Sequence, residues 1–172
     1  MSRAIQDDGL DQEAAGKVPP LPGFFFVAFF LHSEGELMEQ RRILVAASHA
    51  AGRDFIRQAL YKKLPVAALA NNVREEKALR KIGVSEVVHV NTSSIKDNAA
   101  APAFPIGRVF IFEASLPLTC RYLQWAAGCS CLAITVVTHA RHPEVIYKKL
   151  GATYVVRTQT GEVGFLLSRL LE

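Results

Sequence analysis

One segment of the chain occurs twice, and this repeat restricts the folds open to it. Residues 74–92 and 142–160 both read as helix, glycine and strand. The identical pairs are Glu76/Glu144, Lys81/Lys149, Gly83/Gly151, Val87/Val155, Val88/Val156 and Thr92/Thr160. A doubly wound parallel sheet is built from two βαβαβ half-units. We therefore interpret the internal repeat as the two halves of a doubly wound α/β fold.

Apolar and charged residues alternate along the chain in blocks that predict about six strands between helices. Short, wholly apolar runs are typical of parallel strands buried on both faces. The predicted strands are 43–47, 66–70, 86–90, 108–112, 132–137 and 154–157, and the predicted helices are 53–63, 75–81, 118–127, 143–150 and 162–171. Residues 92–107 are read as the crossover between the halves. Right-handed connections then predict a three-layer α/β/α sandwich with strand order 3-2-1-4-5-6.

The first 37 residues differ in charge from residues 38–172, which we assign to one domain. The leader has two basic and six acidic residues, whereas the remainder has 18 basic and 10 acidic residues. Its apolar run, residues 24–31, is much shorter than the roughly 20 residues of a membrane-spanning helix, so no membrane span is predicted.

The codons for Glu-Gly-Glu, directly before Leu37 and Met38, can form a purine-rich bacterial ribosome-binding sequence. We therefore expect residues 1–37 to be an untranslated upstream region, with Met38 as the true start. The alternative is a disordered or membrane-touching tail. The intact mass of the native protein distinguishes the two.

The cysteines favour a reducing compartment and a domain without a metal. Cys120, Cys129 and Cys131 are odd in number and give no disulfide framework, which fits a cytoplasmic protein. Cys129 and Cys131 flank one serine, but no second Cys or His pair at zinc-ligand spacing accompanies them. We read all three as small apolar residues.

The turn after the first strand, Ala46-Ala-Ser-His-Ala-Ala-Gly-Arg53, resembles the glycine-rich turn of NAD(P)-binding Rossmann-fold domains. The two similar groups are the atypical short-chain dehydrogenase-like proteins, with Gly-x-x-Gly-x-x-Gly at this turn, and the nucleotide-binding regulatory domain of potassium channels and transporters. The closing segment of that domain resembles residues 133–170. The resemblance implies a Rossmann-like fold that binds its ligand at the carboxyl edge, between the first and fourth strands.

The three motif positions hold Ala46, His49 and Gly52, so the glycine motif is degenerate. Gly52 keeps the position that allows close packing of helix on strand. His49 stands where glycine lets the backbone approach a pyrophosphate, and its side chain obstructs that approach. However, the amino terminus of a helix attracts anions, and Ser48 and His49 offer side chains that can bind a phosphate there.

The end of the second strand carries no acid for the ribose hydroxyls of NAD. It reads Asn71-Asn72, with Arg74 just beyond. If a dinucleotide binds, the missing carboxylate and the nearby Arg53 and Arg74 favour NADP over NAD, because a 2′-phosphate requires a cation. Both arginines are equally well read as solvated residues near helix starts.

Catalytic groups are sparse. No tyrosine is followed by lysine four residues later, so the Tyr-x-x-x-Lys of short-chain dehydrogenases is missing. Glu113, after the fourth strand, is a candidate base or ribose ligand, and His139 and His142 follow the fifth strand at the same edge. Each alone is also read as an ordinary polar loop residue.

We therefore predict a domain that binds a nucleotide or another phosphate-bearing small molecule as a sensor or accessory protein without its own catalysis. The alternatives are a small NADP-dependent reductase or epimerase, and an interaction protein with a vestigial pocket. Under each of these interpretations, the expected protein partner is a second copy of the chain or a larger partner protein. A response-regulator receiver is disfavoured because its clustered acids are missing. Basic residues scattered over several helices, with no helix-turn-helix, argue against nucleic acid.

Overall fold

The computed structural model describes residues 41–93, 102–139, 144–159 and 163–171. The strands are β1 (Arg42–Ala47), β2 (Val66–Ala70), β3 (Glu86–His89), β4 (Ile106–Phe112), β5 (Ala133–Thr138) and β6 (Tyr154–Arg157). The helices are α2 (Ala50–Tyr61), α3 (Val73–Lys81), α4 (Leu116–Ala127), α5 (Glu144–Lys149) and α6 (Gly164–Leu171). The predicted leader, residues 1–37, lies outside the described residues.

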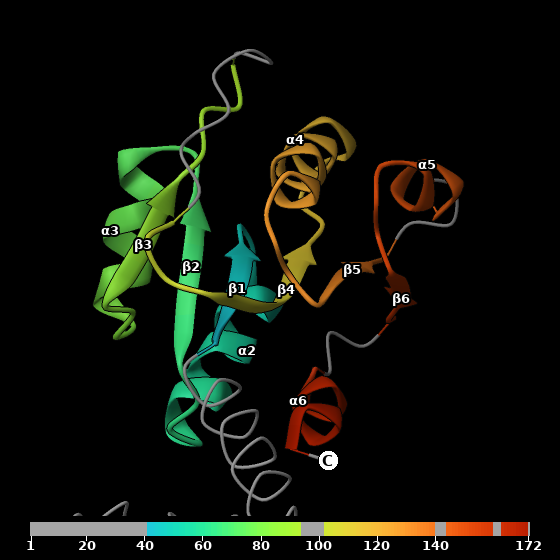
Figure 1. Cartoon of the computed structure of the whole chain (residues 1–172). Coiled ribbons are helices and arrows are strands. Elements are labelled where there is room, and N and C mark those ends of the chain that lie inside the picture. Colours follow the sequence, from blue (N-terminus) through green and yellow to red (C-terminus); the bar gives the residue numbers. More distant parts are fainter. Residues whose placement is uncertain (1–40, 94–101, 140–143, 160–162, 172) are drawn as a thin grey trace, which may run out of the picture. The chain divides into compact units, whose positions relative to one another are not determined.

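The six strands form one parallel sheet in the order β3-β2-β1-β4-β5-β6. In Figure 1 they follow one another from β3 on the left to β6 on the right. The predicted α/β fold, its parallel sheet and its strand order are therefore confirmed. The order reverses between β1 and β4, so the carboxyl ends of these two strands mark the switch point.

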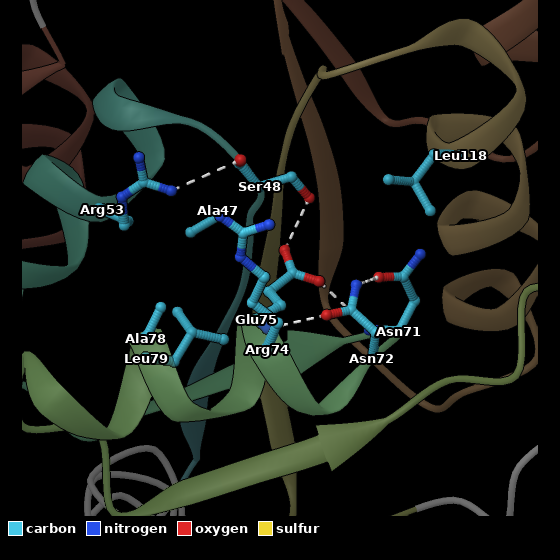
Figure 2. Close-up of a pocket in the computed structure, with 10 residues that line it drawn as sticks. All are labelled: Ala47, Ser48, Arg53, Asn71, Asn72, Arg74, Glu75, Ala78, Leu79 and Leu118. Carbon is cyan, nitrogen blue, oxygen red and sulfur yellow. Dashed lines mark hydrogen bonds between the residues drawn. The ribbon is translucent and has the colours of Figure 1, made fainter.

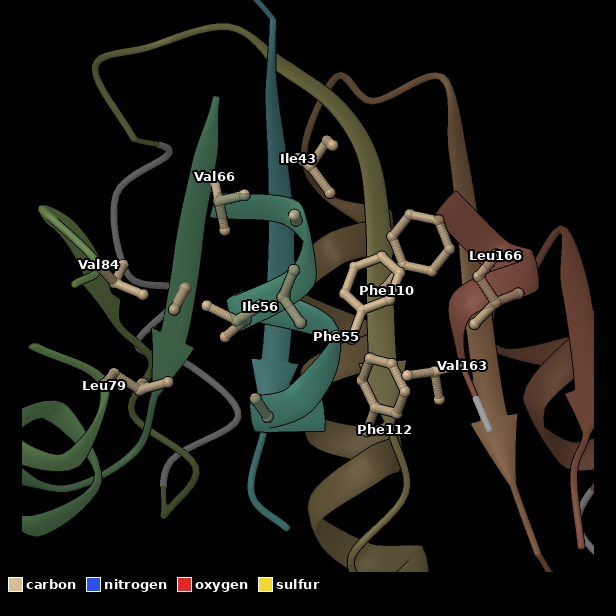
Figure 3. Packing of buried hydrophobic residues seen from close by; sticks show 14 of the residues in the cluster. Ile43, Phe55, Ile56, Val66, Leu79, Val84, Phe110, Phe112, Val163 and Leu166 are labelled. Atoms are coloured by element: carbon tan, nitrogen blue, oxygen red, sulfur yellow. The ribbon is translucent and has the colours of Figure 1, made fainter. Parts of the chain in front are cut away.

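Two apolar clusters cover the two faces of the sheet, because successive residues of a strand point to opposite faces. Val45 and Ala47 pack with α2, α3 and α6, whereas Leu44 and Ala46 pack with α4 and α5. The first cluster contains a group of three phenylalanines (Figure 3). The ring of Phe55 lies 4.9 Å from that of Phe110 and 5.4 Å from that of Phe112, and such pairs contribute about 0.5–1.5 kcal/mol beyond their buried area. This packing fixes α2 against β4.

The two copies of the helix-glycine-strand segment have the same local structure. Gly83 and Gly151 have φ angles of +101° and +104°, which suit glycine because it has no Cβ. Val84 N–H donates to the carbonyl of Leu79 at 3.3 Å, and Ala152 N–H donates to the carbonyl of Tyr147 at 3.0 Å. Each helix therefore ends in a left-handed turn that leads the chain directly into an edge strand.

The predicted boundaries differ from the observed ones by a few residues, chiefly at helix starts. Strands β2 and β6 begin and end where predicted. Helix α3 begins at Val73 because Asn72 caps it, with its side chain accepting from Glu75 N–H, and asparagine is a favoured amino-terminal cap. Helix α2 begins at Ala50, three residues before the predicted start. In the described part of the chain, no helix has the length and apolar character needed to cross a membrane.

Candidate functional site

A cavity of about 400 Å³ lies at the carboxyl ends of β1 and β2. Its volume is within the range of small-molecule sites. The lining residues, drawn in Figure 2, are Ala47, Ser48, Arg53, Asn71, Asn72, Arg74, Glu75, Ala78, Leu79 and Leu118. All but Leu118 come from the first half of the domain. The cavity therefore occupies the β1–β2 side of the switch point.

The Glu75 carboxylate accepts several of the hydrogen bonds around this cavity. Its Oε1 accepts from the Ser48 hydroxyl at 2.8 Å, and its Oε2 accepts from Asn71 N–H at 3.2 Å. The Tyr122 hydroxyl, from α4, donates to the same Oε2 at 3.3 Å. Burial, and next the Glu75 carboxylate, raise the pKa of Tyr122, so this phenol stays protonated as a donor. Three donors thus hold one carboxylate at the edge of the sheet.

The cap of α3 explains why Glu75 points back to the strand ends. Asn72 Oδ1 accepts from Glu75 N–H at 2.8 Å, and the Glu75 side chain returns to the N–H of Asn71. This reciprocal pattern is a variant of the capping box, in which a cap residue is followed three positions later by Glu or Gln. The sequence Asn72-Val-Arg-Glu75 therefore determines where the carboxylate lies.

Two arginines bring positive charge to the cavity. Arg53, in the first turns of α2, has Nη1 3.5 Å from the carbonyl oxygen of Ser48. Arg74, in the first turn of α3, makes no hydrogen bond or ion pair with another described residue. By contrast, Arg80 on the same helix donates to Glu76 at 2.8 Å. Arg74 therefore has no ion-pair or hydrogen-bond partner among the described residues, although the Glu75 carboxylate lines the same cavity.

Gly52 has a packing role and does not line the cavity. A Cβ at this position would lie 2.8 Å from the Cα of Ala47 and 3.1 Å from Cδ2 of Phe112. Such contacts are too short for any larger residue, since the neighbour is backbone. Gly52 therefore lets α2 approach the ends of β1 and β4, which is the role that the motif gives to its last glycine.

His49 lies on the other side of the switch point from the cavity. Its ring meets the ring of Phe112 edge-on, with centroids 5.9 Å apart, and lies 6.0 Å from the ring of His139. Its Nε2 is enclosed and has no hydrogen-bond partner among the described residues. Burial first, and then His139 and Arg53, lower the pKa of His49, while Glu113 opposes this shift. The folded protein therefore favours the neutral imidazole.

The ends of β4 and β5 carry a second group of polar residues. The hydroxyl of Thr138 donates to the carboxylate of Glu113, and Glu113 N–H donates to the carbonyl of Val137 at 2.9 Å. The Tyr147 side chain is fully buried, and burial, followed by the Glu113 carboxylate, raises its pKa. Glu113 is thus held within the fold by its neighbours.

His139 extends this second group towards β6. Its Nδ1 is hydrogen-bonded to the carbonyl oxygen of Thr158, so the Nδ1 carries the proton. The predicted companion, His142, lies outside the described residues. Among the residues that the structure describes, no three His, Cys, Asp or Glu side chains are placed to hold a metal ion.

The structure thus brings together five of the nine predicted cofactor-binding residues. Ser48, Arg53, Asn71, Asn72 and Arg74 line one cavity. Ala46 points to the opposite face of the sheet and packs among the residues of α4 and α5. Gly52, His49 and Glu113 lie outside the lining as described above. These four residues do not line the cavity, and a role for them in cofactor binding remains a prediction.

Glu75 and Tyr122 were not among the predicted site residues. We expected no carboxylate at the end of β2, yet Glu75 supplies one from the first turn of α3. The capping sequence beginning at Asn72 was the available signal, because it orients the side chain of its fourth residue towards the preceding strand. Nothing in the sequence indicated Tyr122, which reaches Glu75 from 47 residues away.

Known proteins resemble this chain in structure. No model of a known protein family matches the sequence, and no curated protein sequence matches it. The NAD(P)-binding domain of an exopolyphosphatase-related protein from Archaeoglobus fulgidus matches with a TM-score of 0.54 and 16% identity, over 75% of this chain and 92% of that one. The TrkA-N domain of the inner membrane protein ybaL from Escherichia coli matches with a TM-score of 0.50 and 16% identity, over 77% of this chain and 97% of that one.

These likenesses agree with the sheet order and the two-faced packing described above. At such low identity they concern the fold and not the ligand. The chain therefore has a Rossmann-like fold similar to NAD(P)-binding and TrkA-N domains.

Proposed function

We propose that the domain binds a nucleotide, or another phosphate-bearing small molecule, in the cavity at the carboxyl ends of β1 and β2, and that it acts as a sensor or accessory protein. The observation that supports this proposal most is Arg74, a cation on the cavity wall with no ion-pair partner among the described residues. In open α/β sheets, ligands bind at the carboxyl ends of the strands beside the switch point. This cavity is at that place.

The amino end of α2 supports a phosphate here. His49 precedes the helix with extended backbone and makes no side-chain cap to it within the described residues. The first N–H groups of a helix and its dipole attract anions. Arg53 adds a guanidinium close to the same helix end. A phosphate near Ser48 would therefore meet backbone donors and a cation together.

Glu75 bears on the choice between NAD and NADP. A carboxylate near the end of the second strand is the usual partner of the ribose hydroxyls of NAD, whereas arginines favour the 2′-phosphate of NADP. This cavity contains both kinds of group, Glu75 and Arg74. Both oxygens of Glu75 already accept hydrogen bonds from the protein. We therefore propose that Arg74 makes the stronger contribution, and that NADP would bind better than NAD if a dinucleotide binds, as expected from the sequence.

The proposed absence of catalysis rests on how the polar groups are held. Glu113 is bonded to Thr138, and His139 to the carbonyl of Thr158. Neither side chain lines the cavity. A general base must reach the proton that it removes. A sensor or accessory role therefore fits better than a reductase or epimerase role.

Calorimetric titration of the full chain with AMP, NAD, NADP and ATP tests this proposal. We expect saturable binding of at least one nucleotide. Arg74→Ala should weaken it about tenfold or more, because a hydrogen bond to a charged group contributes roughly 1.5–3 kcal/mol. The control is Arg80→Ala, which removes a cation from the outer side of the same helix, where it is paired with Glu76.

Equal losses in Arg74→Ala and Arg80→Ala would contradict binding at the cavity, and no binding by the wild type would refute the function. Oxidation of NADPH in the presence of a panel of carbonyl compounds would show an enzyme instead. In that case the absorbance of NADPH at its characteristic wavelength would fall with time. A sensor leaves this absorbance constant.

A further inference from the structure

The cavity lies on one side of the switch point only. Its walls come from the turn after β1, from α2, from the end of β2 and from α3, with Leu118 of α4 at the far wall (Figure 2). A dinucleotide in a doubly wound sheet lies across the switch point, with one nucleotide over each half and the pyrophosphate between them. The cavity lies over one half of the sheet and therefore offers a place for one nucleotide only.

His49 occupies the passage between the two halves. Its ring reaches from the turn after β1 to Phe112 at the end of β4 and to His139 after β5, with centroid distances of 5.9 Å and 6.0 Å. The middle position of the glycine motif is the place where a side chain would block a pyrophosphate. In this chain that position holds a ring that contacts both halves.

The polar side chains beyond His49 already have hydrogen-bond partners within the protein. Thr138 donates to the Glu113 carboxylate, and His139 is hydrogen-bonded to the carbonyl of Thr158. A second nucleotide on this side would compete with these contacts for the same polar groups. On the cavity side, Arg74 has no such contact to lose among the described residues.

We infer that this chain binds a mononucleotide and discriminates against dinucleotides, and that the ring of His49 sets this limit. The inference rests on the proposed nucleotide binding and names the ligand class. His49 here is an obstruction beside the cavity, and it is neither part of the cavity lining nor a phosphate ligand. Its neutral form, favoured by burial, is consistent with a packing role beside Phe112.

Calorimetry with AMP and NAD on the full chain tests the inference. We expect the wild type to bind AMP at least tenfold more tightly than NAD. His49→Gly should bring NAD to within about threefold of AMP and leave AMP binding unchanged. His49→Ala, which keeps the backbone preference of a normal residue, should give a smaller gain for NAD. His139→Ala is the matched control, because it removes the neighbouring imidazole but leaves the turn after β1 intact.

Three results would overturn the inference. They are equal affinity of the wild type for NAD and AMP, loss of AMP binding in His49→Gly, and a gain for NAD in His139→Ala as large as in His49→Gly. The second result would make His49 a phosphate ligand. If the wild type binds neither AMP nor any other nucleotide, the proposed function itself fails. Measuring AMP first therefore separates the two failures. AMP binding tests the proposed site, and the ratio of the NAD affinity to the AMP affinity tests the obstruction by His49.

Discussion

The Tyr122 hydroxyl donates a hydrogen bond to Glu75 Oε2 at 3.3 Å, from 47 residues further along the chain. Tyr122 belongs to α4, in the second half of the domain, and Glu75 to α3, in the first. The two halves are thus joined by a polar contact next to the cavity. Changes to this contact should therefore affect stability as well as the site.

Glu75→Gln should destabilise the protein by about 1–2 kcal/mol. The amide keeps the shape of the side chain but replaces one acceptor oxygen with a donor, which faces the donors Ser48, Asn71 or Tyr122. The free energy of unfolding from urea denaturation measures the loss. Glu76→Gln is the control, since Glu76 is paired at the surface with Arg80 and His89 and should cost less. A larger loss for Glu76→Gln would refute the central place of Glu75.

Gly52→Ala should destabilise the protein by about 1–3 kcal/mol, the usual cost of an overpacked interior. The added Cβ would lie 2.8 Å from the Cα of Ala47, and this neighbour is backbone, which cannot adjust easily. Gly128→Ala should be nearly neutral, because its φ of −80° suits alanine and the nearest atom to its Cβ lies at 3.4 Å. Thermal unfolding compares the two. Similar melting temperatures for both variants would contradict the close packing at Gly52.

Gly83→Ala and Gly151→Ala should both destabilise the protein, by about 1–2 kcal/mol for the left-handed backbone alone. The cost should be larger for Gly151→Ala. Its Cβ would lie 3.2 Å from the Cβ of Ala127, whereas the Cβ of Gly83→Ala would meet only Leu60 Cδ1 at 3.5 Å. Urea denaturation gives both values. A larger loss of unfolding free energy for Gly83→Ala than for Gly151→Ala would show that packing beside the turns does not cause the difference between the two variants.

The free energy of unfolding should fall as the pH is lowered through about 6.5, because of His49. Burial lowers the pKa of this histidine in the folded state from its ordinary value of 6.5. The unfolded chain therefore binds more protons just below that value, and stability rises with pH in this range. The full contribution is present above pH 6.5 and is lost as the pH falls towards the lowered pKa.

Urea denaturation at pH 7.5, 6.5 and 5.5 measures this dependence, with His49→Gln as the comparison. Glutamine has no titratable group, so the variant should show a smaller change between these pH values. His139, Arg53 and Glu113 face the ring and are unchanged in the variant. The same pH dependence in both proteins would assign the effect to another group.

Most of the fold could be predicted from the sequence because it depends on patterns that repeat. Apolar runs give the parallel strands, and the positions of Gly83 and Gly151 give the ends of two helices. Boundaries were less accurate where a side chain outside the helix determines its start. The Asn72 cap, for example, starts α3 two residues before the predicted start. Such caps are local hydrogen bonds and leave the hydrophobic pattern unchanged.

The candidate site was less predictable, because its central contacts join distant residues. Ser48, Arg53 and Arg74 could be named from their place after predicted strands. The acceptor of the Ser48 hydroxyl could not, since Glu75 is 27 residues away in sequence. The surroundings of His49 could be predicted only in part. Its motif position predicted that the side chain obstructs a pyrophosphate, but its contact with Phe112 depends on the packing of α2 against β4.

The twin helix-glycine-strand segments also determine how the sheet ends. In the described part of the chain, each segment supplies one outer strand, β3 or β6, and each of these strands has four residues. Glu86, His89 and Arg157 are exposed at their ends. Short outer strands that carry an exposed charge, here Glu86 in β3 and Arg157 in β6, are a common defence against the addition of further strands, which leads to aggregation. The same unit that extends the sheet therefore protects both of its margins.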